Sequence, residues 1–574
     1  MGKRLFAVMC SFILCGTLVF MGSGNGIAAQ KGPNQPTIEQ HISKSMVHNS
    51  QRPPNPRFSW GSPGPSSPVL NAGSARSAGM VQKSLNKIDD AVQQGIANKI
   101  MPGAVVLVAR RGRVVKHDAY GYAYLYADTN YTKVDQPIKM QEDTIFDLAS
   151  LTKVFTATAI MQLYEEGKLD LDDPVARYIP EFAQNGKSAV TVLQLLTHTS
   201  GFRPWVPLYQ MADNREEAYQ IVFSYPLRYE PGTHYVYSDL NFITLGALVE
   251  RISGKRLDQY IEENITGPLN MDDTMFNPPE RLKDRIAATE YQPWTGRGLV
   301  WGEVHDENAW LMNGVSGHAG LFSTAHDLAI FAQMILNDGK YKGARILEPQ
   351  TVAMIETNQL PDFPGDAHGL GWELGQGWYM DALAGPSTMG HTGFTGTSMV
   401  ISPGNQAIAI LLTNNVHPTR EAPSTNPIRR KVARWTADAI PVAIPGEGKE
   451  KAWFSGYGSH VNRMLTAKVD LVDEAELSFD TWFRTENGYD LGYVEVSQDG
   501  AHWEKIANFT GSSGNWMNET LTLPAGTQYV RFRYDTDSII NGRGWYIHDV
   551  VISQADSHER TLEFANDGWQ KRDY

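Results

Sequence analysis

The hydrophobic pattern changes at a Pro- and Gly-rich break, Pro441 to Lys449, and this change divides the sequence into two parts. Before the break, apolar residues recur at helical spacing in several segments. After it, apolar and polar residues alternate, as in residues 475–483, which is typical of half-buried strands. Residues 81–442 and 450–574 are therefore expected to form two domains that differ in secondary structure.

The first of these parts begins and ends with strand patterns and is helical between them. Ala104–Ala109 is a continuous apolar run, and Ser398–Ser402 and Ala407–Leu412 are further strand candidates. If strands from both ends share one sheet, the helices between them cover it. We therefore predict an α/β domain with an antiparallel sheet flanked by helices. The second part has at least four strand patterns, among them Gln528–Tyr534 and Trp545–Ile552, and is predicted to be an all-β sandwich.

The start of the chain has the composition of an export signal followed by a spacer. A short basic start, an apolar run from Leu5 to Met21 and a stretch of small residues predict a signal peptide over residues 1–29. The protein is then expected to be secreted and cell-wall associated. An uncleaved anchor is one alternative, and lipidation of Cys15 is another, which Leu14 disfavours because a small residue is expected there. Residues 30–80, rich in Pro, Ser, Asn and Gly, are predicted to be a flexible linker.

Cysteine content and net charge exclude several classes of site and partner. Both cysteines, Cys10 and Cys15, lie in the predicted signal peptide, so the mature chain has no disulfide, thiolate metal site or cysteine nucleophile. Acidic residues exceed basic ones by 63 to 50, and the net charge is -13. Because phosphate repels such a chain, nucleic acid is not expected as a partner.

A Ser-x-x-Lys pair is the first candidate catalytic feature, and it occurs twice, at Ser84/Lys87 and at Ser150/Lys153. Gly-x-Ser-x-Gly and HExxH are absent. Ser150 opens a predicted helix, Leu151 to about Gly167, whose N-terminus favours developing negative charge, and the lysine returns to the same face one turn later. Such a lysine can accept the serine proton or stabilise the alkoxide. Ser84 lies inside an amphipathic helix and is not expected to be a nucleophile; for Ser150, helix N-capping is the structural alternative.

Four motifs follow one another in a recognisable order: Phe146–Lys153, Leu195–Phe202, Tyr237–Asp239 and Gly390–Gly393. Through them the α/β part resembles the serine β-lactamase and penicillin-binding protein superfamily, in particular its class C, esterase and D-aminopeptidase branch. The resemblance implies a serine hydrolase that works through an acyl-enzyme, with no metal and no cofactor in its catalytic site.

The resemblance also implies a role for individual residues. Ser150 would be the acylated nucleophile and Lys153 its proton partner. Tyr237 would carry protons to the leaving group. His391, where many members have lysine, would bind the substrate carboxylate as a pH-dependent cation. The backbone N–H groups of Ser150 and Phe394 would form the oxyanion hole.

Two residues depart from the family pattern and leave the substrate open. Asp239 replaces the asparagine of the third motif, so it can pair with Lys153 and disfavour an anionic substrate group nearby. His391 in place of lysine weakens fixed positive charge, which makes efficient β-lactam turnover less expected. Thr392 and Gly393 complete the predicted substrate and oxyanion residues. A carboxylesterase or a weak β-lactamase with the same site remains an alternative.

A second signature, Val304–Ala309 with Gly317–Phe322, resembles the branch linked to muropeptide recycling, which includes secreted N-acetylmuramoyl-L-alanine amidases. It implies cell-wall peptides as substrates, cleaved by an amidase or a D-Ala peptidase. His305 and His318 are the candidate substrate-binding residues. A substrate-cleft loop, a structural hydrogen-bonding loop and a metal site are the alternatives; neighbouring residues point in different directions, so metal is not expected.

Within the second part, residues 451 to about 556 resemble the β-sandwich accessory domain of immune-inhibitor-A-type secreted metallopeptidases. The resemblance is carried by Trp453–Gly456, Leu477–Trp482, Gly492–Ser497 and Gly544–Asp549. Its aromatic residues are expected in the core, with binding of cell-wall glycan as the alternative. Asp480 and Asp549 are candidate Ca²⁺ ligands. A wall-binding protein without catalysis is the third functional interpretation.

Overall fold

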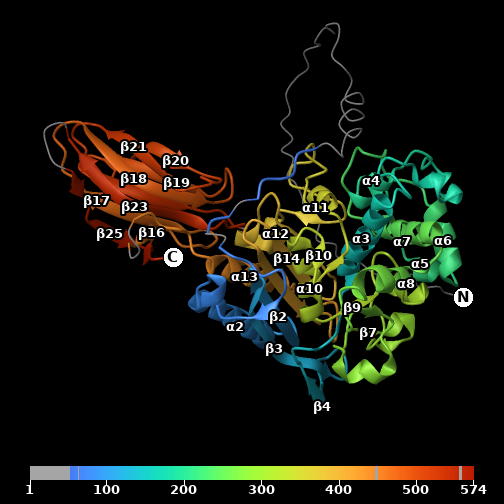
Figure 1. The fold of residues 1–574 in the computed structure, drawn as a ribbon. Helices are drawn as coiled ribbons and strands as arrows, with labels where there is room; N and C mark the ends of the chain where they lie inside the picture. Colours follow the sequence, from blue (N-terminus) through green and yellow to red (C-terminus); the bar gives the residue numbers. More distant parts are fainter. Residues whose placement is uncertain (1–51, 58, 62–63, 447–449, 539, 555–558) are drawn as a thin grey trace, which may run out of the picture. The chain divides into compact units, whose positions relative to one another are not determined.

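The computed structural model describes the chain from residue 52 to its end, apart from residues 58, 62–63, 447–449, 539 and 555–558 (Figure 1). The predicted signal peptide lies outside the described residues. Among the helices that are described, none combines the length and the apolar character needed to cross a membrane.

A sheet with strand order β1-β3-β2-β15-β14-β13-β12 forms the centre of the α/β domain. Its strands are β1 (Asn71–Ala72), β2 (Gly103–Arg110), β3 (Arg113–Tyr126), β12 (Glu373–Leu374), β13 (Met389–Thr392), β14 (Ser398–Ser402) and β15 (Ala407–Thr413), with β4 (Lys133–Lys139) beside β3. β2 and β15, from the two ends of the domain, pair antiparallel, as the sequence predicted. The short edge strand β1 is parallel to β3, so the sheet is mixed rather than wholly antiparallel.

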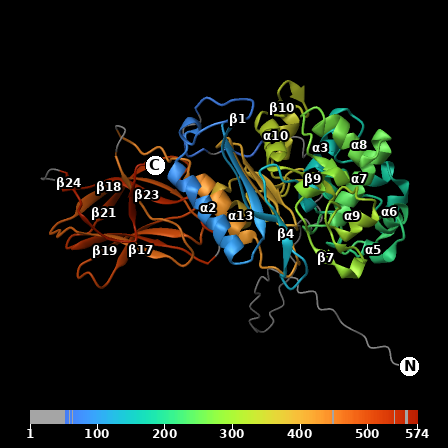
Figure 2. The ribbon, with the colours of Figure 1, turned by 90° about the horizontal axis from the view of Figure 1, so that it is seen from below.

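Helices cover both faces of this sheet, which explains why β2 is apolar at nearly every position. Val105 and Leu107 pack into one core, whereas Val106 and Val108 pack into the other, because successive strand side chains point to opposite faces. On one face α2 (Gln82–Ala97) and α13 (Asn426–Asp438) lie side by side (Figure 2). The other core is built around α3 (Thr152–Glu165), α7 (Asp239–Ser253) and α10 (Ala325–Leu336).

Shorter elements complete the helical region between the strands. The helices are α4 (Val192–Leu196), α5 (Leu208–Met211), α6 (Arg215–Ser224), α8 (Leu257–Ile261), α9 (Glu307–Leu311), α11 (Pro349–Ile355) and α12 (Gly377–Met380). The strands are β5 (Phe146–Asp147), β6 (Met275–Phe276), β7 (Tyr291–Gln292), β8 (Gly298–Leu299), β9 (Leu321–Ser323), β10 (Lys340–Tyr341) and β11 (Ala344–Arg345). β9 lies between β5 and β6, so it holds the segment just before Ser150.

The described part of the predicted linker is structured, which corrects the expectation of a flexible chain over residues 30–80. Trp60 is buried and its Nε1 donates a hydrogen bond to the carbonyl of Ile440. Arg57 forms an ion pair with Glu356 at 2.9 Å. Composition predicted flexibility because Pro, Ser and Gly form few contacts, but these two side chains have partners about 300 or more residues away in the sequence.

The C-terminal part is a domain of two antiparallel sheets, coloured orange to red in Figure 1. One sheet contains β16 (Ala452–Phe454), β18 (Ala475–Arg484), β21 (Met517–Leu523), β23 (Gly544–Ser553), β24 (Arg560–Thr561) and β26 (Gln570–Arg572). The other contains β17 (Asn462–Lys468), β19 (Leu491–Ser497), β20 (Glu504–Phe509), β22 (Tyr529–Asp535) and β25 (Phe564–Asp567). Phe479, Phe532 and Trp545 are buried between them, so these aromatic residues belong to the core, as expected, and are not an exposed glycan platform.

Candidate active site

Ser150 and Lys153 are brought together by a 3₁₀ turn, Ala149–Leu151, that leads into α3. Lys153 Nζ donates a hydrogen bond to Ser150 Oγ at 2.8 Å. Ala149 has a φ of 46°, a left-handed conformation that costs roughly 1–2 kcal/mol for a residue with a side chain. Asp147 Oδ1 accepts a hydrogen bond from the Ala149 N–H at 2.8 Å, which stabilises the turn. The strained turn therefore positions the predicted nucleophile beside its lysine.

The other Ser-x-x-Lys serine is structural, as the sequence predicted. Ser84 is buried in α2, and its hydroxyl donates a hydrogen bond to Asp438 Oδ2 at 2.8 Å. Lys87 lies 4.2 Å above the ring of Trp435. With its hydroxyl engaged and no exposed surface, Ser84 cannot receive a substrate.

Lys153 is fully buried and holds the centre of the site together. Its Nζ lies 2.8 Å from Asp239 Oδ1, the pairing that the sequence suggested, and it also donates to the His318 carbonyl at 3.4 Å. Burial by itself lowers the pKa of Lys153, but the charge of Asp239 and the neighbouring Tyr237 together raise that pKa above its ordinary value. The resting site therefore contains an ammonium, which suits stabilisation of a serine alkoxide better than acceptance of the serine proton.

Tyr237 lies two residues before the start of α7, and the ammonium of Lys153 is 4.7 Å from the centre of its ring. Burial raises the pKa of the Tyr237 phenol, and the charge of Lys153 lowers it in part, with hydrogen bonding to Lys153 and Ser150 acting in the same direction as that charge. The pKa remains above its ordinary value, so the phenol is neutral near neutral pH. A neutral hydroxyl at this position can act as a proton relay, because it accepts one proton while it donates its own.

His391 is buried in β13, and its protonation state corrects the expectation of a pH-dependent cation. Burial, followed by the charge of Lys153, lowers the pKa of His391 to about 3. Its Nδ1 lies 2.8 Å from the carbonyl of Thr392, and because a carbonyl only accepts, Nδ1 carries the proton. The imidazole is therefore neutral near neutral pH, and its Nε2 is an acceptor rather than a charged donor.

The loop after β13 lies against the segment that precedes Ser150. A Cβ at Gly393 would lie 2.1 Å from Thr397 Oγ1 and 2.3 Å from the Leu148 carbonyl, so only glycine allows this approach. Among the loop and turn hydrogen bonds of the described chain, neither the Ser150 N–H nor the Phe394 N–H is a donor. The oxyanion hole formed by these two groups stays a prediction.

Comparison with known proteins agrees with this geometry. A family model described as Beta-lactamase matches residues 88–434. The chain belongs to the β-lactamase family. It is a serine hydrolase of the β-lactamase and penicillin-binding protein type, which acts through an acyl-enzyme. The family match ends before the C-terminal domain, whose resemblance to the immune-inhibitor-A-type module stays a prediction.

Two relatives of this β-lactamase-family chain and one solved structure illustrate the similarity. An Escherichia coli K12 protein named "Putative D-alanyl-D-alanine carboxypeptidase" is 36% identical over 392 residues, which are 63% of this chain and 89% of that protein. A Salmonella typhimurium LT2 protein of the same name is 35% identical over 393 residues, with the same coverage. The crystal structure of a penicillin-binding protein homologue from Caulobacter crescentus is 20% identical, with a TM-score of 0.49, and covers 63% of this chain and 99% of that chain.

His305, from the second signature, is buried and contacts both the β13 loop and the nucleophile turn of this β-lactamase-family site. Its ring stacks on exposed Phe394, with 5.6 Å between ring centroids, and its Nε2 donates to Glu290 Oε2 at 2.8 Å. Burial alone raises the pKa of Glu290, but hydrogen bonds from His305 and Arg420 lower it to about 2. The His305 N–H also donates to Asp147 Oδ2 at 2.6 Å, so this signature supports the turn that positions the nucleophile.

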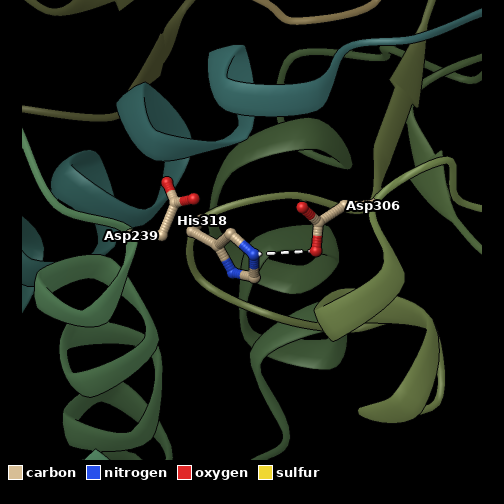
Figure 3. Close-up of side chains that lie close together, drawn as sticks. All are labelled: Asp239, Asp306 and His318. Carbon is tan, nitrogen blue, oxygen red and sulfur yellow. Dashed lines mark hydrogen bonds and ion pairs between the residues drawn. The ribbon is translucent and has the colours of Figure 1, made fainter. Parts of the chain in front are cut away.

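His318 and Asp306 face each other from two loops (Figure 3). His318 Nε2 donates to Asp306 Oδ1 at 3.0 Å, and one ligand atom each from His318, Asp306 and Asp239 lie within 4.8 Å of one another. Three such ligands could hold a metal ion, but the Lys153 ammonium already occupies Asp239 and would repel a second cation. The contacts favour the hydrogen-bonding loop among the three alternatives, and the absence of a metal from the reaction stays a prediction.

His198 is a site residue that the sequence interpretation did not assign, although it lies in the quoted motif Leu195–Phe202. Its Nδ1 accepts hydrogen bonds from the Ser238 N–H at 3.1 Å and from Asn241 Nδ2 at 3.0 Å, and its ring centre lies 4.7 Å from that of Tyr237. His198 thus positions the loop that carries Tyr237. The sequence signal that could have identified His198 was its place in this motif.

Glu373 is a second site-adjacent residue that the sequence did not indicate. It lies on β12 opposite Gly390, next to His391, and its Oε2 is buried without a hydrogen-bond partner in the described chain. Burial raises the pKa of this carboxyl to about 7. A single glutamate on a short edge strand carries no sequence signal of this kind.

Proposed function

We propose that this protein is a secreted hydrolase that removes terminal D-alanine from peptidoglycan stem peptides through an acyl-enzyme on Ser150. The observation that carries the proposal is the 2.8 Å contact between Lys153 Nζ and Ser150 Oγ at a strained turn. The names of the relatives support the choice of substrate. The predicted signal peptide supports a location outside the cytoplasm.

In the proposed acylation step, Ser150 Oγ attacks the carbonyl carbon of the scissile amide. The serine proton passes to the hydroxyl of Tyr237 while Tyr237 gives its own proton to the leaving nitrogen, so no phenolate forms. The Lys153 ammonium stabilises the alkoxide as it develops, and the N–H groups of Ser150 and Phe394 receive the oxyanion. D-Alanine leaves as the free amine, and water then hydrolyses the ester by the reverse proton path.

The neutral His391 favours one second candidate, a carboxylesterase. A substrate with a free carboxylate gains no ion pair from a histidine whose pKa is about 3. An ester without a carboxylate needs none. The same feature argues against efficient β-lactam turnover, because it removes a fixed cation from that side of the site.

A digest of purified muropeptides by the mature protein, read by mass spectrometry, tests the proposal. We expect loss of one terminal D-alanine, and no loss with Ser150→Ala. Ser84→Ala is the matched control and should keep activity, because Ser84 only bonds to Asp438. Release of the whole stem peptide from the aminosugar would make the enzyme an amidase. Turnover of short-chain esters alone would favour the esterase, and an inert protein would overturn both candidates.

A further inference from the structure

Three carboxylates converge in the C-terminal domain, outside the catalytic site and outside every motif of the sequence analysis. Glu486 and Asp490 lie in the loop between β18 and β19, and Asp537 follows β22. One oxygen from each of the three lies within 4.8 Å of the others. The loop is tight, because the Asp490 N–H donates to the Glu486 carbonyl at 3.0 Å.

Two buried oxygens of this group, one on Asp490 and one on Glu486, lack donors in the described chain. Asp490 is 0% exposed, and its Oδ1 accepts a long hydrogen bond, 3.3 Å, from the Asp537 N–H. Asp490 Oδ2 is buried with no hydrogen-bond partner in the described chain, and the same holds for Glu486 Oε2. Buried carboxylate oxygens are almost always bonded, because leaving water without a new partner is unfavourable. The group therefore needs protons or a cation.

Neighbouring charges do not supply what is missing. Burial raises the pKa of Glu486 to about 7, and the charges of Asp537 and Asp490 act in the same direction. Burial raises the pKa of Asp490 to about 6, with the charge of Asp537 in the same direction and backbone hydrogen bonds from Asp537 and Glu486 opposing it. The charge of Arg430 lowers the pKa of Glu486 and that of Arg434 lowers the pKa of Asp490, but each acts less strongly than burial, and both guanidiniums also form ion pairs with Asp381. Above about pH 7, where Glu486 and Asp490 have both lost their protons, these two charges repel each other unless a cation lies between them.

We propose that Glu486, Asp490 and Asp537 bind one calcium ion, which fastens the β18–β19 loop to the end of β22. All three ligands are hard oxygen donors, and no nitrogen or sulfur ligand joins them in the described chain. Ca²⁺ accepts carboxylates in irregular geometry and completes its shell with carbonyls and water, whereas Mg²⁺ demands a regular octahedron. Calcium would stabilise the accessory domain rather than take part in hydrolysis.

This position differs from the one that the sequence suggested. Asp480 Oδ1 accepts a hydrogen bond from Asn518 Nδ2 at 3.0 Å, and Asp549 is exposed. Neither belongs to a converging group of three ligands among the described residues. The sequence offered those two aspartates as Ca²⁺ ligands together with backbone carbonyls, whereas the packing of two loops brings the three carboxylates together.

Thermal unfolding of the full mature protein in EDTA and in CaCl₂ tests the proposal. At a calcium concentration about 100 times Kd we expect the transition of the C-terminal domain to rise by roughly 5–10 °C. Asp490→Asn should lose this shift, whereas Glu476→Gln, an exposed carboxylate on β18, should keep it. Glu486→Gln provides the same comparison if Asp490→Asn does not fold.

Terbium luminescence gives an independent readout. Tyr534 lies close enough to Asp490 for that carboxylate to raise the pKa of its phenol, so it should sensitise Tb³⁺ bound at the site. Added calcium should displace Tb³⁺ and so remove the luminescence, and Asp490→Asn should show no luminescence from this site. The proposal is wrong if the wild-type protein melts identically in EDTA and calcium while Asp490→Asn is more stable in both, because protons then fill the site. A larger shift with MgCl₂ than with CaCl₂ would also overturn it.

Discussion

Lys153 Nζ and Asp239 Oδ1 lie 2.8 Å apart, with the lysine side chain fully buried and the aspartate side chain 18% exposed. This ion pair joins α3, which begins beside the nucleophile, to the first residue of α7. Because Asp239 keeps Lys153 charged, it decides whether the lysine stabilises an alkoxide or accepts a proton. Asparagine, the family residue at this position, would leave that balance to the surrounding dipoles.

Asp239→Asn is the first test of this relationship. The pKa of Lys153 should fall in this variant, so activity should decline at a basic pH where the ammonium loses its proton. The wild-type pH–rate profile should show no such basic limb below pH 10. The variant should also lose about 2–4 kcal/mol of stability, since a buried charge loses its partner. Because folding raises the pKa of Lys153, the stabilising contribution of the ion pair is complete below the unfolded pKa of about 10.5 and declines only above it. The stability lost in Asp239→Asn should therefore be equal at pH 6 and pH 8.

Urea unfolding at the two pH values and a profile of kcat/KM provide the measurements, with Ser150→Ala as the stability control that changes no charge. An acid limb that moves to lower pH in Asp239→Asn, with no new basic limb, would instead identify Lys153 as the general base.

His391 provides a second prediction, because its pKa of about 3 removes it from titration near neutral pH. His391→Gln should leave the pH–rate profile between pH 5 and 8 unchanged in shape. His391→Lys should add a fixed cation and lower KM for carboxylate-terminated substrates about tenfold, the usual effect of a charge-assisted hydrogen bond. Esters without a carboxylate should show no such gain. A wild-type limb near pH 6.5 that disappears in His391→Gln would contradict the assignment.

Gly393→Ala tests the contact between the β13 loop and the nucleophile turn. The added Cβ would meet Thr397 Oγ1 and the Leu148 carbonyl, so the loop must move and displace the Phe394 N–H. We expect kcat to fall about 10²–10³-fold, as when one oxyanion donor is lost. Gly254→Ala is the control: φ is 71° there and no atom lies within 4 Å, so it should cost about 1 kcal/mol of stability and no activity. Equal activity losses in both variants would count against the oxyanion assignment.

Glu373→Gln tests the buried carboxyl on β12. Its pKa is raised from 4.5 to about 7, so the folded protein holds this proton more tightly than the unfolded chain does. The carboxyl therefore destabilises the fold increasingly as pH rises from about 4.5 to about 7. Glu373→Gln should gain roughly 1–3 kcal/mol at pH 8 and little at pH 4, measured by urea unfolding. A gain that is independent of pH would show that the carboxyl is not the cause.

Local pattern was sufficient for the elements whose geometry repeats along the backbone. Ser150 and Lys153 meet because residues three apart face each other across a helical turn, and that spacing is visible in the sequence. The strands at Ala104–Ala109 and Ala407–Leu412 were predicted from their apolar runs, and they pair as expected. The sequence also predicted the ion pair between Lys153 and Asp239, because the two residues carry opposite charges and lie in motifs of the same family.

The tertiary structure decided the properties that depend on what surrounds a side chain. The neutral state of His391 and the raised pKa of Glu373 come from burial by distant elements, and the ordering of Trp60 comes from a partner 380 residues away. The carboxylates of Asp490 and Asp537 converge only after two loops pack together. Periodicity is fixed by bonds between neighbouring residues, whereas desolvation and electrostatic fields are sums over the whole fold, and no short pattern encodes such a sum.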